Sequence, residues 1–358
     1  MKNILVLLAF IAIQSNLYAQ ETYSIVGSVK NQKGEALASA TVFIAGSEKA
    51  AASDAEGRFR FNGLTPGTYQ VVVNMLGYES AKQNVILKNA AETVSITLAP
   101  KTILLNDVNI GKSDRKKQIK IFTDAFMGES SNVKYCKILN PDLLEFSTAK
   151  GTLKATTSDF LIIENNALGY RIKYLLKTFS HQEAQDLTFY DGDYSFEQMK
   201  GTPEQQQKWE KARQEAYEGS LMHYLRSLYA GTTRQEGFLV YKIVSSIFPI
   251  VIETIPIPAE QIIKRSETSL ITFRYDARFY IVYDKKKAAK PDPTHVGTDE
   301  LNNLYYYGSI FNTDARVDSR GSFTNYDRIF MQGFWGRKRV ADQLPWEYMP
   351  PVVAVAIK

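Results

Sequence analysis

The sequence predicts a multi-domain protein in which an all-β sandwich precedes an α+β domain. Between residues 22 and 99, apolar and polar residues alternate in short runs separated by turn residues. Period-two alternation buries one face of a strand and exposes the other, as in an antiparallel sheet. From residue 121 to residue 358, helical patterns come first and strand patterns follow, which favours an α+β domain. The chain of 358 residues also exceeds what one hydrophobic core usually serves.

The N-terminus has the features of a secretory signal peptide. Lys2 supplies a positive charge, Ile4–Ile13 is an uninterrupted apolar run, and the small residue Ala19 precedes the expected cleavage point. A membrane-spanning helix needs about 20 apolar residues, so the run is too short for an anchor. We therefore expect a signal peptide over residues 1–19 and an exported mature chain with no transmembrane span.

Charge and cysteine content narrow the possible functions. The formal net charge of +5 is spread along the chain, and the basic clusters are short: Arg115–Lys117, Lys285–Lys287 and Arg337–Arg339. Runs of this length are typical of solvated loops, so no nucleic-acid partner is expected. Cys136 is the single cysteine, so the chain has no internal disulfide and this residue is expected to be a small buried apolar side chain.

The first predicted domain consists of short strands separated by turns. The alternation is clearest in Tyr23–Val29, Arg58–Phe61, Tyr69–Met75 and Thr93–Leu98. Turn residues fall at Lys33–Gly34, Asp54–Gly57, Pro66–Gly67 and Leu76–Gly77. Because glycine supplies the positive φ that many turns need, we expect a positive φ at Gly67. About six or seven strands in so short a segment predict a β-sandwich.

Four blocks of this domain resemble the carboxypeptidase-regulatory-like domain family in order and spacing. They are Val26–Val29, Gly34–Val42, Asp54–Phe59 and Leu64–Tyr69. The resemblance implies a transthyretin-like sandwich over residues 22–99 that has no catalytic residues of its own. It also implies relatives that bind carbohydrate and relatives that stand at the front of outer-membrane receptors.

Residues 100–120 lose the alternation and gain charge, with five Lys or Arg against one Asp from Lys112 to Lys120. We interpret them as a linker. Beyond it, apolar residues from Leu168 to Phe179 follow helical spacing. Thr202–Gln205 is a capping box with proline at the first helical position. Gly219 and Gly231 bound a further predicted helix.

The remainder of residues 121–358 reads as strands at Phe238–Val244, Thr268–Tyr275, Arg278–Asp284 and Tyr305–Phe311. Several motifs here resemble the C-terminal domain of an uncharacterised group of exported, sandwich-bearing envelope proteins: Asn140–Asp142, Gly169–Tyr174, Glu218–Arg226, Gly333–Gly336 and Leu344–Pro345. This resemblance implies a location in the periplasm or at the outer membrane of a Gram-negative cell. It implies no activity.

The residues that a metallocarboxypeptidase requires are missing from the sequence. Zinc would need two His and a Glu at ligand spacing, whereas His181, His223 and His295 stand apart from one another. No Gly-x-Ser-x-Gly elbow and no phosphate-binding glycine loop is present. Asp191–Asp193 is expected to be a plain turn rather than a calcium loop. We therefore predict no catalytic residue, no cofactor and no metal.

The candidate binding residues are aromatic and basic: Trp335, Trp346, Tyr306, Arg171 and Arg226. Aromatic rings stack on sugars and anchor protein partners, and the arginines lie beside apolar stripes where they line a polar cleft or form structural ion pairs. Alternatively, the aromatic side chains are packed in the hydrophobic core of the domain.

These observations favour a non-catalytic exported envelope protein with a binding or assembly role. Its partner would be an envelope protein or a glycan. Two alternatives remain open at this point: a carbohydrate-binding envelope protein and an envelope hydrolase of unknown class. Loss of glycan retention on Trp335→Ala and Trp346→Ala would favour the first alternative. Turnover of wall fragments that depends on Glu164 or His223 would favour the second.

Overall fold

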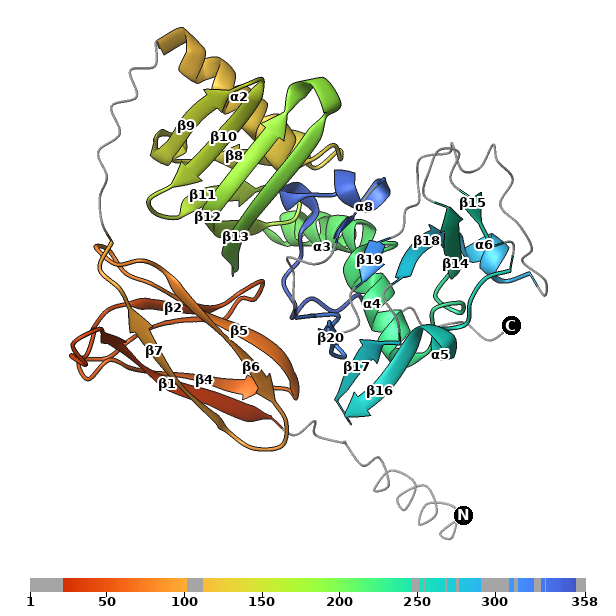
Figure 1. Cartoon of the computed structure of the whole chain (residues 1–358), viewed down its shortest axis with the longest axis horizontal. Coiled ribbons are helices and arrows are strands. Elements are labelled where there is room, and N and C mark those ends of the chain that lie inside the picture. The colour runs from red at the N-terminus through yellow and green to blue at the C-terminus, as the bar shows by residue number, and fades with distance from the viewer. Residues whose placement is uncertain are drawn as a thin grey trace.

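A computed structural model describes residues 22–101, 112–245, 251–253, 255–267, 269–274, 277–290, 309–311, 315–324, 330–331 and 333–351 (Figure 1). The predicted signal peptide, the central part of the predicted linker, His295 and Tyr306 lie outside these residues. Among the described residues, no helix is both long and apolar enough to cross a membrane.

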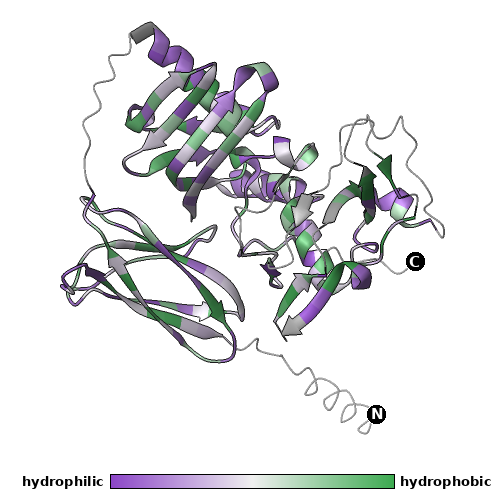
Figure 2. Ribbon diagram, viewed as in Figure 1, coloured by the Kyte–Doolittle hydropathy of each residue, from purple (hydrophilic) through white to green (hydrophobic). Residues whose placement is uncertain are grey.

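The N-terminal residues form the predicted β-sandwich. One sheet has the order β4-β1-β7, and the other has the order β3-β2-β5-β6. The strands are β1 (Tyr23–Asn31), β2 (Thr41–Ile44), β3 (Ala50–Ala52), β4 (Arg58–Leu64), β5 (Gly67–Asn74), β6 (Ala81–Leu87) and β7 (Glu92–Leu98). Hydropathy varies in bands along these strands (Figure 2). In β4 and β7 the alternation buries one face and exposes the other, whereas β5 of the second sheet is buried on both faces. A closed core results, which includes Ile25, Val42, Phe61, Val71 and Ile96.

Three of the predicted turn glycines have the expected backbone. The φ angles of Gly34, Gly57 and Gly77 are 85°, 74° and 84°. The prediction for Gly67 is wrong, because this residue opens β5 and is not among the glycines with positive φ. Its small size matters for a different reason, since a Cβ atom there would lie 2.5 Å from Oδ2 of Asp318.

A central sheet follows the sandwich, with the order β8-β11-β12-β10-β9 and with β13 paired to β12. Its strands are β8 (Cys136–Ile138), β9 (Leu144–Ala149), β10 (Thr152–Thr157), β11 (Leu161–Asn165), β12 (Tyr170–Gln182) and β13 (Leu187–Gln198). Helices α2 (Lys112–Met127) and α3 (Pro203–Tyr217) contribute Phe122, Phe126 and Tyr217 to its hydrophobic cluster. Short 3-10 turns lie at Val133–Tyr135, Pro141–Leu143, Glu183–Gln185 and Val340–Asp342.

Two local predictions fail in this part of the chain. The predicted helix after Asn165 is the long strand β12, which buries Leu175 as well as Tyr174 and Leu176. This strand is buried on both faces, and its register shifts between Leu176 and Thr178. Its apolar residues therefore do not alternate with polar ones, and their spacing resembles that of a helix. Residues 112–120 of the predicted linker form the start of helix α2. The charged residues lie on the exposed side of this helix, and its buried side becomes evident only further along, at Phe122.

The third region contains α4 (Leu221–Ala230) and sheets ordered β15-β14-β18-β19-β21 and β16-β17-β20. Its strands are β14 (Phe238–Ser245), β15 (Val251–Ile252), β16 (Ile263–Glu267), β17 (Leu270–Phe273), β18 (Ala277–Tyr283), β19 (Ser309–Phe311), β20 (Arg316–Val317) and β21 (Phe330–Met331). Its short helices are α5 (Ala259–Ile262), α6 (Lys285–Ala288) and α8 (Phe334–Arg337). This region has hydrophobic clusters separate from that of the central sheet.

The described chain is therefore mostly β, with strands on both sides of the main helices rather than after them alone. The helix boundaries agree with the capping signals. Thr202 caps α3 and Gln205 reaches back to the Thr202 N–H, while Ser220 caps α4. Gly231 ends α4 with a φ of 73°.

The capping box gives a first testable prediction. Thr202→Ala removes the acceptor for the Gln205 N–H, so the free energy of unfolding should fall by about 1 kcal/mol. Urea denaturation measures the change. Thr156→Ala, at an exposed position of β10, is the matched control and should change stability by less than about 0.5 kcal/mol. Equal effects of the two substitutions would contradict the role of the cap.

Candidate functional site

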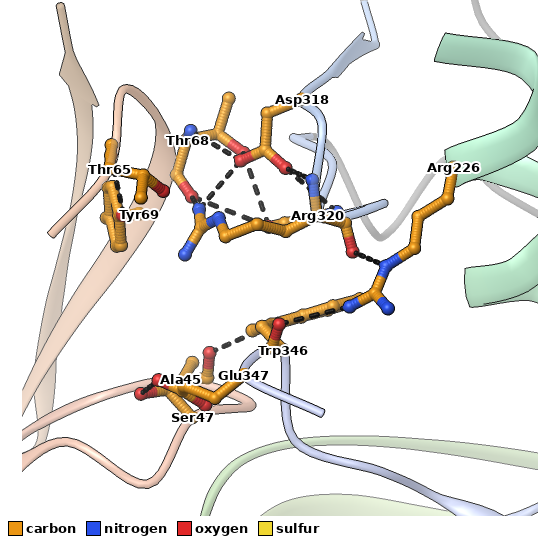
Figure 3. Close-up of polar contacts among 11 residues, drawn as sticks. Ala45, Ser47, Thr65, Thr68, Tyr69, Arg226, Asp318, Arg320, Trp346 and Glu347 are labelled. Carbon is orange, nitrogen blue, oxygen red and sulfur yellow. Dashed lines mark hydrogen bonds and ion pairs between the residues drawn. The ribbon is translucent and has the colours of Figure 1, made fainter. Parts of the chain in front are cut away.

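The turn of one hairpin in the sandwich lies between two distant parts of the chain, and it is closed by a hydrogen bond from the Ile44 N–H to the Lys49 carbonyl. The loop is Ala45–Glu48, between β2 and β3. One wall of the cleft is the end of β13, and the other is Leu344–Met349, which we call the C-terminal strap. We call this arrangement the junction cleft, and Figure 3 shows part of it.

The β13 wall contacts the loop through one isolated β-bridge. The Gly46 N–H donates to the Tyr194 carbonyl at 2.7 Å, and the Phe196 N–H donates to the Ser47 carbonyl at 2.9 Å. Ser47 and Ser195 form a parallel bridge. Because β12 takes the other edge of β13, the loop contacts the outer edge of the central sheet at this point.

The strap wall binds the opposite side of the loop. The Trp346 N–H donates to the Gly46 carbonyl at 2.9 Å, and its indole N–H donates to the Ala45 carbonyl at 3.1 Å. The Glu347 carboxylate accepts from the Ser47 hydroxyl at 2.6 Å and from the Glu48 N–H at 3.1 Å. Most of these contacts involve backbone groups of the loop, so they fix the course of its main chain.

The surroundings of the loop also restrict which residues can stand at two of its positions. Gly46 has a φ of 71°, and a Cβ atom there would lie 2.3 Å from the Trp346 indole nitrogen. Only glycine therefore fits without displacing the ring. Glu48 accepts from the Gln198 amide at 2.9 Å. Burial raises the pKa of the Glu48 carboxyl, Gln198 opposes that rise, and the nearby Glu347 carboxylate adds to it.

The strap is held in position by Arg226 of α4. Its buried guanidinium donates to the carbonyls of Arg320 and Trp346 at 2.8 and 3.1 Å (Figure 3). It also donates to the Tyr348 carbonyl at 2.8 Å. Burial lowers the pKa of this guanidinium, which also lies over the Tyr217 ring. One arginine thus orients both the strap and the turn that follows β20.

That turn makes a second contact with the sandwich. The Asp318 carboxylate is fully buried and accepts from the Thr68 N–H at 2.8 Å and from Arg320 Nη2 at 2.7 Å. Arg320 also donates to the Thr68 carbonyl at 2.6 Å and stacks on Tyr69 with 3.9 Å to the ring centroid. Burial is the strongest single influence and acts to lower the pKa of Arg320, but the charge and hydrogen bond of Asp318, together with Tyr69 and Glu347, raise the pKa overall.

The structure brings together only part of the predicted binding set. Trp346 and Arg226 both belong to the junction cleft. Trp335 is 6% exposed and its indole N–H donates to the Gly219 carbonyl at 2.8 Å, so it is a core residue. Arg171 lies apart on the central sheet, paired with Glu164 at 2.7 Å. Tyr306 lies outside the described residues.

The histidines and acidic residues have structural contacts. His223 is buried: its Nδ1 accepts from the Gly219 N–H at 3.0 Å and its Nε2 faces Glu236 at 3.1 Å. His181 lies in β12 and is hydrogen-bonded to Thr188 at 2.9 Å. Asp191–Asp193 is part of β13 and not a turn. Among the described residues, no group of His, Cys, Asp or Glu is arranged to hold a metal ion.

Sequence reasoning missed Gly46, Ser47, Asp318 and Glu347. Each is a small or polar residue in a loop, and no periodicity or motif distinguishes it. Their roles depend on contacts across a sequence separation of 250 to 300 residues. In the strap, the sequence indicates the motif Leu344–Pro345 and the aromatic residue Trp346, but nothing distinguishes Glu347.

Comparisons with known proteins agree with the fold of the first domain. Residues 24–99 match the family model of the carboxypeptidase regulatory-like domain, as the four sequence blocks predicted. No curated protein matches the chain.

Several solved structures are similar to a quarter or less of the chain. The shaft pilin SpaA from Lactobacillus rhamnosus GG is 20% identical with a TM-score of 0.20, over 24% of this chain and 50% of that one. GBS52, the minor pilin of Streptococcus agalactiae, is 17% identical with a TM-score of 0.21, over 25% and 49%. The 3-chlorocatechol 1,2-dioxygenase of Rhodococcus opacus 1CP is 13% identical with a TM-score of 0.20, over 23% and 62%. Less than two thirds of each of these chains is covered.

The buried pair Asp318–Arg320 gives a second prediction. Asp318→Asn leaves the Arg320 charge buried without its partner, so the free energy of unfolding should fall by about 3 kcal/mol or more. Chemical denaturation measures the loss. Asp124→Asn breaks the exposed Lys120–Asp124 pair and should cost less than about 1 kcal/mol. A loss for Asp318→Asn no larger than that of the control would show that the pair does not stabilise the junction.

The third prediction concerns pH. Burial lowers the pKa of His223, and the Glu236 carboxylate only partly opposes this. The unfolded chain then binds more protons than the folded chain, so stability is complete above the ordinary histidine pKa of 6.5 and falls as the pH drops below it. His223→Asn keeps an acceptor for the Gly219 N–H but cannot titrate. Denaturation from pH 7.5 to 5 should therefore show a shallower decline for this variant. An unchanged slope would contradict the assignment.

Proposed function

We propose that this chain is a non-catalytic exported protein of the cell envelope with a binding or assembly role. The carboxypeptidase-regulatory-like sandwich would be a docked module, and the rest of the chain would carry the specificity. The exported location rests on the N-terminal sequence and on the resemblance to exported envelope proteins. We place the protein in the periplasm or at the outer membrane of a Gram-negative cell.

One observation carries the binding role. The hairpin turn Ala45–Glu48 is hydrogen-bonded through backbone groups on two sides. The two sides belong to the central sheet and the strap, not to the sandwich. The remainder of the chain therefore already binds one folded module through its surface loop, and we infer that it binds a partner in the same way.

The non-catalytic part of the proposal is supported by the engagement of the candidate acid–base groups. Both ring nitrogens of His223 are occupied, one by a backbone N–H and the other by Glu236. Burial raises the pKa of the Cys136 thiol to about 12, which disfavours the thiolate a nucleophile needs. Burial of Trp335 likewise gives no support to a sugar-stacking surface at that position.

Crosslinking of the full mature chain in its native envelope, followed by mass spectrometry, tests this proposal. One discrete protein partner should appear at reproducible crosslinked positions, without release of peptide or sugar fragments from purified cell wall. Release of fragments that is lost in Glu164→Gln or His223→Asn would establish a hydrolase instead. Retention of purified glycan without any protein partner would favour the carbohydrate-binding alternative.

A further inference from the structure

Met349, in the C-terminal strap, is the most exposed methionine of the described part of the chain. Its side chain is 71% exposed, whereas Met331 is 39% exposed and Met127 is fully buried. The other described methionines, which are partly buried, are Met75, Met199 and Met222. Because exposure favours oxidation of a side-chain sulfur, a dissolved peroxide should attack Met349 first.

The Met349 sulfur also contacts the guanidinium that positions the strap. Arg226 Nη1 donates to this sulfur at 3.7 Å and to the Tyr348 carbonyl at 2.8 Å. Other N–H groups of the same guanidinium donate to the carbonyls of Arg320 and Trp346. Since a thioether is only a weak acceptor, one N–H of this buried cation has a much poorer partner than the others.

Oxidation by hydrogen peroxide would convert the weak acceptor into a strong one. A lone pair of the Met349 sulfur attacks one peroxide oxygen, so that an S–O bond forms and the O–O bond breaks. The proton of the transferred oxygen moves to the departing hydroxide, which leaves as water. The sulfur loses two electrons and the peroxide gains them. The product is a sulfoxide, whose negatively polarised oxygen accepts well from a cationic donor.

The separation of 3.7 Å between Nη1 and the sulfur leaves room for that oxygen. An N–H···O bond is about 2.9 Å long, and an oxygen bonded to the sulfur to one side of the N···S line spans this distance. The exposed end of the side chain can be oxidised on its solvent side. Rotation about the Cγ–Sδ bond then brings the oxygen toward Arg226.

We propose that Met349 is an oxidation site and that its sulfoxide strengthens the hold of Arg226 on the strap. The strap contacts the hairpin turn of the sandwich through Trp346 and Glu347. The oxidised chain therefore holds the sandwich more firmly than the reduced chain does. Enzymatic reduction of the sulfoxide reverses the change. The inference goes beyond the proposed binding role and does not depend on the identity of the partner.

The test treats the full mature chain with dilute hydrogen peroxide. Peptide mass spectrometry should find the added oxygen at Met349 before Met331. Hydrogen exchange, read by mass spectrometry, then reports the opening of the strap. The Trp346 N–H donates to the Gly46 carbonyl. Its exchange should slow about threefold or more after oxidation, because opening then breaks an additional hydrogen bond to a charged group.

Three variants make the outcome specific. Met349→Gln supplies an amide oxygen and should slow exchange at Trp346 without any peroxide. Met349→Leu has a similar volume but no acceptor, so peroxide should leave its exchange unchanged. Met331→Leu is the matched control, because it removes the other exposed methionine and should still show the slower exchange after oxidation. Both positions are exposed, so all three variants should fold like the wild type.

Two results would overturn the inference. The first is oxidation of Met331 or of a partly buried methionine ahead of Met349. The second is unchanged or faster exchange at Trp346 in Met331→Leu protein that mass spectrometry shows to be oxidised at Met349. Neither result affects the crosslinking of an envelope partner, so failure of this inference and failure of the proposed function are distinguishable.

Discussion

The position of the sandwich against the rest of the chain depends on one buried guanidinium, that of Arg226. Arg226 needs acceptors because an unpaired buried charge is costly, and it finds them in carbonyls of the strap and of the turn after β20. Both segments then face the sandwich, one toward Ala45–Glu48 and the other toward Thr68. The hydrogen bonds that Arg226 makes inside the third region thus help to orient the sandwich, which lies more than a hundred residues away in the sequence.

The fold of the sandwich could be predicted from the sequence because its strands and turns are determined by residues that are close together in the chain. Alternation in Arg58–Phe61 and the glycines at Gly57 and Gly77 specify strands and turns without reference to distant residues. The helix caps at Thr202 and Ser220 were predictable for the same reason. In β12, burial on both faces hid the strand, because apolar residues at Tyr174, Leu175 and Leu176 no longer alternate.

The candidate site was predictable only in part, because it is assembled from contacts of long range. Trp346 and Arg226 are of residue types that often bind partners. Trp346 contacts the loop in the junction cleft, and Arg226 holds Trp346 in position. Gly46 and Asp318 have ordinary neighbours in sequence, and their importance appears only when Trp346 and Thr68 are placed against them. Trp335 and Tyr224 show the opposite case, in which conspicuous aromatic residues pack inside the protein.

The parallel pairing of β1 with β7 has a mechanical consequence. The chain enters the sandwich along β1 and leaves it along β7, and the two strands are registered from Ile25–Glu92 to Asn31–Leu98. Tension applied between the two ends of the sandwich would pull these strands in opposite directions along their length. All the hydrogen bonds of that ladder would then bear the load together in shear instead of opening one after another. A module of this design resists stretching along the chain.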